Sequence, residues 1–180
     1  MITNNFKNLC ATMLEMTGLN MGILPVVDTQ NRTYYIACAL NSGYPLIVYD
    51  DRVRTEVYFS GISIGSGNRE ESSSDYDLQT PIFEGFSATV TKEHGLDNGD
   101  PYLEYTIDIE NTGENSITIN EIGYVQSFRV LPEQLVAVPV TVYSCAALVD
   151  RTVLSSPVTI AVGETKTITY RLKTTISSAS

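Results

Sequence analysis

The chain has 180 residues, of which 43% are hydrophobic, and a formal net charge of −10 from 21 acidic and 11 basic residues. A chain of this length buries about 70% of the surface that its unfolded form exposes, so we expect one domain that needs no disulfide or metal. The acidic balance, without any basic cluster, argues against direct binding to nucleic acid or to an anionic membrane.

The first predicted element is a short amphipathic helix near the N-terminus. Apolar residues follow the i, i+3, i+4, i+7, i+8 pattern of one helical face at Phe6, Leu9, Cys10, Met13 and Leu14. Residues 3–5 offer N-cap side chains, and Gly18 follows where the helix would end. A helix of about four turns is marginal in isolation, so its apolar face is expected to dock. It docks either on the chain's own sheet or on a neighbouring subunit, and the sequence leaves both open.

After this segment the apolar residues recur with the period of two that is typical of strands. Short strands are predicted at residues 23–27, 33–40 and 46–49, with turn residues between them. A longer strand is predicted at residues 55–64, where Gly61 indicates a bend or a bulge. The first third of the chain beyond the helix is therefore expected to be all-β.

A polar loop is predicted at residues 65–75, and the strand pattern resumes at 81–83 and 86–91. The clearest strand is 102–110, in which apolar and polar side chains alternate strictly. Its apolar positions are Leu103, Tyr105, Ile107 and Ile109, and its polar positions are Glu104, Thr106, Asp108 and Glu110. One face of this strand is expected in the core and the other in solvent.

The last third of the chain continues as strands. Residues 117–124 begin the return from the strand before them, and the apolar run 136–149 is expected to hold one or two central strands despite Pro139. A final hairpin is predicted at residues 158–172, because apolar residues alternate on both sides of a Gly-Glu turn.

Together these segments predict an all-β fold of about nine or ten strands. The expected arrangement is a two-sheet antiparallel β-sandwich, Ig-like or jelly-roll-like, with a short N-terminal amphipathic helix. The chain lacks helix-length crossovers between strands, which excludes a parallel α/β sheet. We expect an N-terminal helix or arm at residues 1–20, the sandwich at 21–174 and a polar tail at 175–180.

A search for catalytic or metal-binding residues finds no convincing set. The one histidine, His94, lies in residues 92–100, which are expected to form a solvated hairpin loop, and a lone loop histidine is rarely catalytic. Asp97–Asp100 offers oxygen ligands for calcium, but Asp-Asn-Gly is also common turn chemistry. The three cysteines lack metal spacing and are expected to be buried free thiols. We therefore expect no enzyme, no cofactor, no metal, no targeting segment and no membrane span.

Three groups of motifs stand in order along residues 55–172. The first group is Ile62–Asn68, with its Gly-Ser-Gly turn, followed by Asp75–Leu78 and Pro81-Ile82. The second is Tyr105–Gly113 followed by Ile117–Gly123, and the third is Leu148–Leu154 followed by Pro157–Ile160, Gly163-Glu164 and Ile168–Tyr170. In this order and spacing they resemble small virion structural proteins, tail- or neck-associated, of the tailed bacteriophages and prophages of gut bacteria.

The resemblance implies a structural component of a tailed-phage virion in the tail, neck or collar region. Such a protein acts through contacts with other virion proteins and with copies of itself in a ring or multimer, and it brings no catalytic residues. It would be made in the bacterial host cytoplasm and end in the virion. One alternative is a capsid decoration or head-fibre base protein. The other is a carbohydrate- or receptor-binding β-sandwich module that binds a host-surface glycan through exposed tyrosines.

The candidate partner contacts lie in the predicted helix and in the polar loop. They are Phe6, Leu9 and Met13 in the helix and Gly65, Asn68, Asp75 and Tyr76 in or next to the loop. An apolar stripe that must dock and a long exposed loop are both features that interaction surfaces use.

Overall fold

The computed structural model describes residues 1–5, 7, 24–36, 47–48, 52–53, 61–98, 100–130 and 143–173. The named regular elements in these ranges are all strands: β1 (Leu24–Val27), β2 (Thr33–Ile36), β3 (Ile47–Val48), β4 (Arg52–Val53), β5 (Gly61–Gly65), β6 (Phe86–Asp97), β7 (Asp100–Asn111), β8 (Ile117–Val130), β9 (Tyr143–Ile160) and β10 (Thr165–Lys173). The predicted all-β class is therefore confirmed. The predicted N-terminal helix lies almost wholly outside the described residues, and so do Phe6, Leu9 and Met13.

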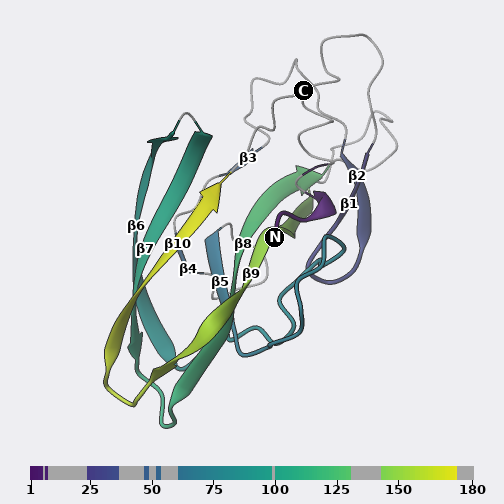
Figure 1. The fold of residues 1–180 in the computed structure, drawn as a ribbon. Helices are drawn as coiled ribbons and strands as arrows, with labels where there is room; N and C mark the ends of the chain where they lie inside the picture. Colours follow the sequence, from purple (N-terminus) through teal and green to yellow (C-terminus); the bar gives the residue numbers. More distant parts are fainter. Residues whose placement is uncertain are drawn as a thin grey trace.

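The strands form two main sheets and a separate hairpin of β1 and β2 (Figure 1). Sheet I has the strand order β10-β7-β6 and is antiparallel throughout. Sheet II has the order β3-β8-β5-β4, with β9 paired to β8. The pairing in sheet II is antiparallel with one exception. The two-residue strand β4 runs parallel to its neighbour β5.

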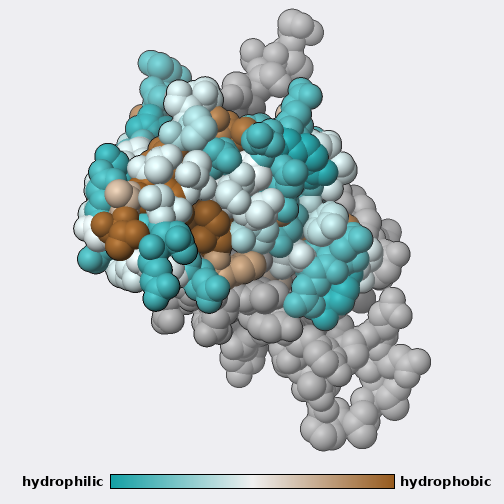
Figure 2. Space-filling view, turned by 90° about the horizontal axis from the view of Figure 1, so that it is seen from below, coloured by the Kyte–Doolittle hydropathy of each residue, from teal (hydrophilic) through white to brown (hydrophobic). Residues whose placement is uncertain are grey.

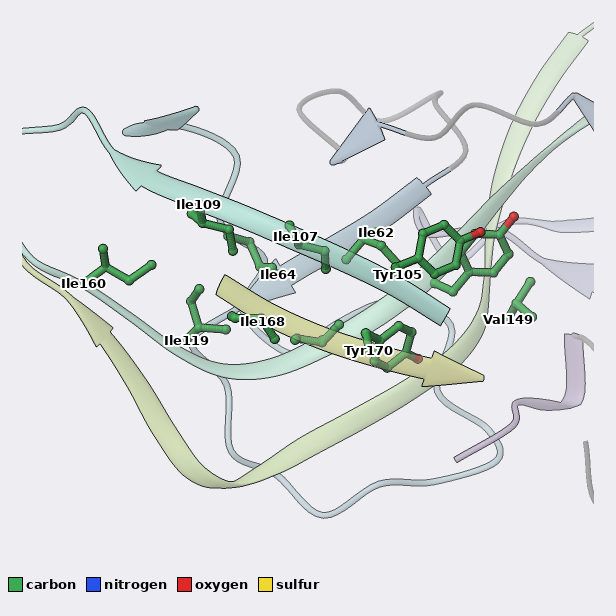
Figure 3. Packing of buried hydrophobic residues seen from close by; sticks show 12 residues of the cluster. Ile62, Ile64, Tyr105, Ile107, Ile109, Ile119, Val149, Ile160, Ile168 and Tyr170 are labelled. Atoms are coloured by element: carbon green, nitrogen blue, oxygen red, sulfur yellow. The ribbon is translucent and has the colours of Figure 1, made fainter. Parts of the chain in front are cut away.

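Apolar side chains from both main sheets meet in one core (Figure 3). The alternation of β7 buries Tyr105, Ile107 and Ile109 to 1% exposure or less, as its sequence pattern predicts. The other buried members are Ile62, Ile64, Ile119, Ile122, Tyr124, Val149, Ile160, Ile168 and Tyr170. Tyr105 of sheet I stacks on Tyr124 of sheet II with ring centroids 5.6 Å apart. Since each large apolar side chain contributes about 1.5–3 kcal/mol on burial, this core is the main source of stability.

The hairpin predicted at residues 158–172 is wrong, because the strands on either side of its turn belong to different sheets. β9 pairs with β8 in sheet II, whereas β10 pairs with β7 in sheet I. The turn itself is present: the Glu164 N–H donates to the Ala161 carbonyl (2.9 Å), and Gly163 has a φ of +74°. Alternation tells which side chains face the core but not which strand lies alongside, so both arrangements fit the same pattern.

The chain also passes from sheet I to sheet II between β7 and β8, and Asn111 ties the two passages together. Its backbone N–H donates to the Glu164 carbonyl (3.0 Å), and its carbonyl accepts from the Gly163 N–H (2.9 Å). Its buried side-chain amide donates to the carbonyls of Ile160 (2.9 Å) and Asn115 (2.8 Å). One residue thus satisfies backbone groups on both crossings.

The loop predicted at residues 92–100 is also wrong, because β6 runs on to Asp97, which pairs with Asp100 of β7. His94 therefore lies on a strand opposite Leu103, with an exposed side chain. Asn98 has a φ of +54°, the left-handed backbone that a tight hairpin turn requires. The hairpin is present, but its turn is far shorter than the polar composition indicates.

β9 is a single strand of 18 residues, where the sequence predicts separate strands at 136–149 and from 158 onward. Pro157 lies in an irregular stretch between Val153 and Val158, where the register with β8 shifts. A proline is tolerated there because its missing N–H interrupts no regular ladder. Residues 136–142 lie outside the described part of the chain.

Candidate functional site

A long loop, residues 66–80, leaves β5 and crosses the side of sheet II that faces away from the core (Figure 1). We call it the capping loop; it confirms the loop predicted at residues 65–75 and extends beyond it. Leu78 packs on Val125, Ala146 and Leu148 in a small second apolar cluster. Charged and backbone groups make the contacts described next, and they hold the loop in place.

Arg151 of β9 is at the centre of these polar contacts, and its side chain is completely buried. Its Nε donates to Glu121 Oε2 (2.8 Å), and its Nη1 donates to Asp75 Oδ2 (2.8 Å). The same guanidinium donates to two carbonyls of the capping loop, those of Glu70 (3.3 Å) and Arg69 (2.9 Å). A planar group with five N–H donors suits such a multiple contact, which a lysine could not make.

Glu121 of β8 is the second fully buried charge. Besides pairing with Arg151, its carboxylate accepts hydrogen bonds from the backbone N–H groups of Gly67 (3.1 Å), Gln79 (3.1 Å) and Thr80 (2.9 Å). These amides come from both ends of the capping loop. One side chain therefore fixes the start and the end of the loop to the same point on sheet II.

Asp75 completes the network from within the loop, and its side chain is 2% exposed. Its second oxygen pairs with Arg69 Nη2 (2.5 Å), and the Ser72 N–H donates to Oδ2 (2.9 Å). The two carboxylates of Asp75 and Glu121 thus face two guanidinium groups, one buried and one exposed. Buried charges are tolerated only when they are paired and hydrogen-bonded, as all of these are.

Three glycines let the loop approach the sheet closely. A Cβ at Gly67 would lie 2.5 Å from the Gln79 Cβ and 2.6 Å from Glu121 Oε1. A Cβ at Gly65 would lie 2.6 Å from the same carboxylate oxygen, and one at Gly123 would lie 2.7 Å from a side-chain carbon of β9. The Gly-Ser-Gly turn is therefore required for the approach of backbone to a buried carboxylate.

A second buried polar pair lies on the core side of β9. The Tyr170 hydroxyl of β10 donates to the carboxylate of Asp150, whose other oxygen lies 3.3 Å from the Met1 amino group. Burial, and then the negative charge of Asp150, raise the pKa of Tyr170 well above its usual value. The pair connects sheet I to sheet II.

The capping-loop network can hold a conformation, because each of its charged side chains contacts another member or the backbone. Across the ranges that the structure describes, no group of three His, Cys, Asp or Glu side chains could hold a metal ion. Asp97 and Asp100, the candidate calcium ligands, form the last pair of the β6–β7 ladder. No helix in the described ranges is long and apolar enough to span a membrane.

The candidate contact residues that the structure describes fall into two groups. Gly65 and Asp75 are buried and belong to the network, so their roles are internal. Asn68 and Tyr76 are exposed on the capping loop, with Tyr76 at 39%. Of the described candidates, Asn68 and Tyr76 are therefore the ones whose side chains can meet a partner.

Sequence reasoning misses Arg151 and Glu121, the two buried charges on which the loop depends. Glu121 lies between Ile119 and Ile122 in β8, and Arg151 lies between Val149 and Val153 in β9. A charge inside an apolar strand is itself a signal, because it must find an opposite charge in the fold. The sequence thus signals that each of these two charges needs a partner, and the fold decides which residue that partner is.

Comparison of the chain with protein-family models, with curated proteins and with solved structures finds no match. A function therefore has to be inferred from the capping loop, from the network beneath it and from the motifs that contribute its residues.

Proposed function

We propose that this chain is a structural component of a tailed-phage virion, in the tail, neck or collar region, which acts through protein–protein contacts. We propose further that its two sheets form an Ig-like or jelly-roll-like sandwich and that an amphipathic helix begins near Phe6. The observation that carries the proposal is the capping loop. It lies at the surface, and the buried ion pairs of Arg151 with Asp75 and with Glu121 fix its conformation.

The motifs behind the family resemblance converge on this loop. Gly65, Gly67 and Asp75 come from the first group, Glu121 comes from the second and Arg151 from the third. These residues are far apart in the sequence, yet they form one network. The network supplies a physical reason for the three groups to occur together in proteins that present such a loop.

A loop held in this way is suited to binding a protein partner. Its exposed positions include Asn68, Glu70, Ser74 and Tyr76. Because the loop is ordered before binding, little conformational entropy is lost when a partner docks. Tyr76 is also of a residue type that often contributes strongly at interfaces, since its ring buries area at a small entropic cost.

The outer face of sheet I has the opposite character, because its side chains are engaged with one another. The Thr167 hydroxyl donates to Asp108 (2.6 Å) across β10 and β7. Arg171 pairs with Glu104 (2.5 Å) and stacks over the Tyr102 ring, 4.3 Å from its centroid. These polar and charged side chains already bind one another across the strands, so we assign the partner contact to the capping loop and not to this face.

The end of the molecule in Figure 2 carries its brown, hydrophobic residues as small separate islands among white and teal ones. A surface of this kind suits contacts of ordinary size, about 800 Å² on each partner, with isolated aromatic anchors. It does not resemble the continuous apolar surface of an obligate dimer.

Quantitative mass spectrometry of purified particles tests the proposal. Particles produced from the phage or prophage that encodes this chain should contain it at a fixed ratio to the major capsid protein. Absence of the chain from intact particles would overturn the proposal. Glycan-array binding by the isolated protein would instead favour the carbohydrate-binding alternative.

A pair of matched variants tests the part assigned to the capping loop. Asn68→Ala combined with Tyr76→Ala should reduce incorporation into particles several-fold without changing thermal stability, because neither side chain belongs to the buried network. Thr89→Ala, an exposed change on the outer face of sheet I, is the control and should incorporate normally. Equal incorporation of both variants would show that the loop does not make the contact.

A further inference from the structure

Residues 1–5 occupy a defined seat on the outer edge of β9. Ile2 forms an antiparallel bridge with Asp150, and the Thr3 N–H donates to the Val149 carbonyl (3.0 Å). Thr3 is completely buried and Asn5 is 6% exposed. Met1 to Thr3 thus add to the sheet edge in the way that extended peptides bind to edge strands, and Asn4 and Asn5 after them are helical.

A β-bulge in β9 makes this seat specific. Leu148 pairs with Val125 and Asp150 pairs with the preceding residue of β8, so Val149 is the extra residue. Successive carbonyls of a regular strand point to opposite sides, whereas a bulge lets two neighbouring ones face the same way. The Thr3 hydroxyl lies 2.6 Å from the Leu148 carbonyl oxygen and 3.0 Å from that of Val149.

Asn5 closes the seat by binding a backbone unit of β1. Its Nδ2 donates to the Val27 carbonyl (2.7 Å), and its Oδ1 accepts from the Val27 N–H (2.8 Å). The same Nδ2 lies 3.2 Å from the Leu148 carbonyl oxygen. A side-chain amide therefore imitates a strand residue and joins the N-terminal segment, β1 and β9.

We propose that in the multimer this seat receives residues 1–5 of a neighbouring copy, so that copies exchange their N-terminal segments. The inference rests on the proposed role in an assembly. If residues 6–17 form the proposed helix, the connector of residues 6–23 spans at most about 38 Å, which still reaches an adjacent subunit. The exchanged contacts are chemically identical to the internal ones, so only the connector and the local concentration distinguish the two forms.

Concentration then decides which form is present. Covalent attachment holds the chain's own segment at an effective concentration in the millimolar range, so the isolated chain keeps its segment in its own seat when dilute. Packing of copies in a particle raises the concentration of neighbouring segments to a similar level.

Photo-cross-linking of isotope-mixed protein tests the exchange. Asn4 is exposed, and its backbone N–H donates to the Ser73 carbonyl of the capping loop (2.7 Å). A photoreactive phenylalanine analogue at position 4 should therefore cross-link to this loop. Equal amounts of unlabelled and heavy-nitrogen chains are unfolded together, refolded at low and at high concentration, irradiated, digested and analysed by mass spectrometry.

Exchange predicts same-isotope cross-links at low concentration and mixed-isotope cross-links that rise with concentration until both kinds are equally frequent. Same-isotope cross-links alone at every concentration would overturn the exchange. That result would leave the virion role unaffected, because particle composition tests it separately. Thr3→Val, which lacks the hydroxyl that binds β9, should lower the mixed yield several-fold. Mixed cross-links that persist unchanged in this variant would come from random collisions and would equally overturn the proposal.

Discussion

Replacement of Arg151 by alanine is predicted to destabilise the protein strongly. The change leaves the buried carboxylates of Glu121 and Asp75 without their shared positive partner, and it removes the donor to two carbonyls of the capping loop. Breaking a buried ion pair by removal of one member costs about 3–5 kcal/mol, since an uncompensated charge stays behind. This is a large part of the roughly 5–15 kcal/mol by which most domains are stable.

Urea unfolding followed by circular dichroism measures this loss. With a denaturant slope of about 2 kcal/mol per molar urea, the unfolding midpoint of Arg151→Ala should fall by about 2 M. Arg171→Ala is the matched control, because this arginine also pairs with a glutamate but on the exposed face of sheet I. A midpoint for Arg151→Ala that matches the control would refute the assignment of the network as the support of the loop.

A triple variant with a neutral network separates the effect of charge from that of shape. This variant combines Arg151→Met, Glu121→Gln and Asp75→Asn. It leaves no buried charge unpaired, so part of the stability lost in Arg151→Ala should return. Recovery should be incomplete, because the amide that replaces Glu121 has one acceptor oxygen for three backbone N–H groups of the loop. Stability no better than that of Arg151→Ala would mean that packing, not charge, dominates the site.

Three further predictions follow from individual contacts. Gly67→Ala should lower the free energy of unfolding by about 1–3 kcal/mol in thermal denaturation, because its methyl group would overlap Glu121. Asn111→Ala should cost about 1–3 kcal/mol in urea unfolding, since one carbonyl at each sheet crossing loses its donor and that of Ile160 is buried. The raised pKa of Tyr170 means that the folded state holds this proton more tightly than the unfolded chain, so its contribution to stability is complete below about pH 10 and is lost as pH rises towards the folded pKa. Tyr170→Phe should remove this alkaline loss, and an unchanged slope of stability against pH would contradict the assignment.

The alternation of β7 could be predicted because it depends only on neighbouring residues. Which strand lies beside which could not, as the turn at Gly163 shows: the same alternating residues fit a hairpin or a crossing between two sheets. The choice is made at Asn111, whose backbone and side-chain groups bind both crossings. Such a contact between distant segments leaves no local pattern in the sequence.

The capping loop shows a similar division. Its existence and its glycines follow from composition, and Asp75 is correctly marked as important. Its role is different from the predicted one. A short polar side chain in a loop is normally exposed, but Asp75 is buried because its carboxylate pairs with Arg151, 76 residues later. The charge of Arg151 within an apolar strand was the visible signal, and pairing it with Glu121 required the fold.

Native-state hydrogen exchange of the capping loop tests most directly whether this loop is a rigid surface. The amides of Gly67, Gln79 and Thr80 donate to the buried Glu121 carboxylate, so the loop can open only when these bonds and the ion pairs part. We predict that they exchange nearly as slowly as the central amides of β7. Exchange of these three amides at the rate of an unfolded chain, while β7 stays protected, would contradict the claim.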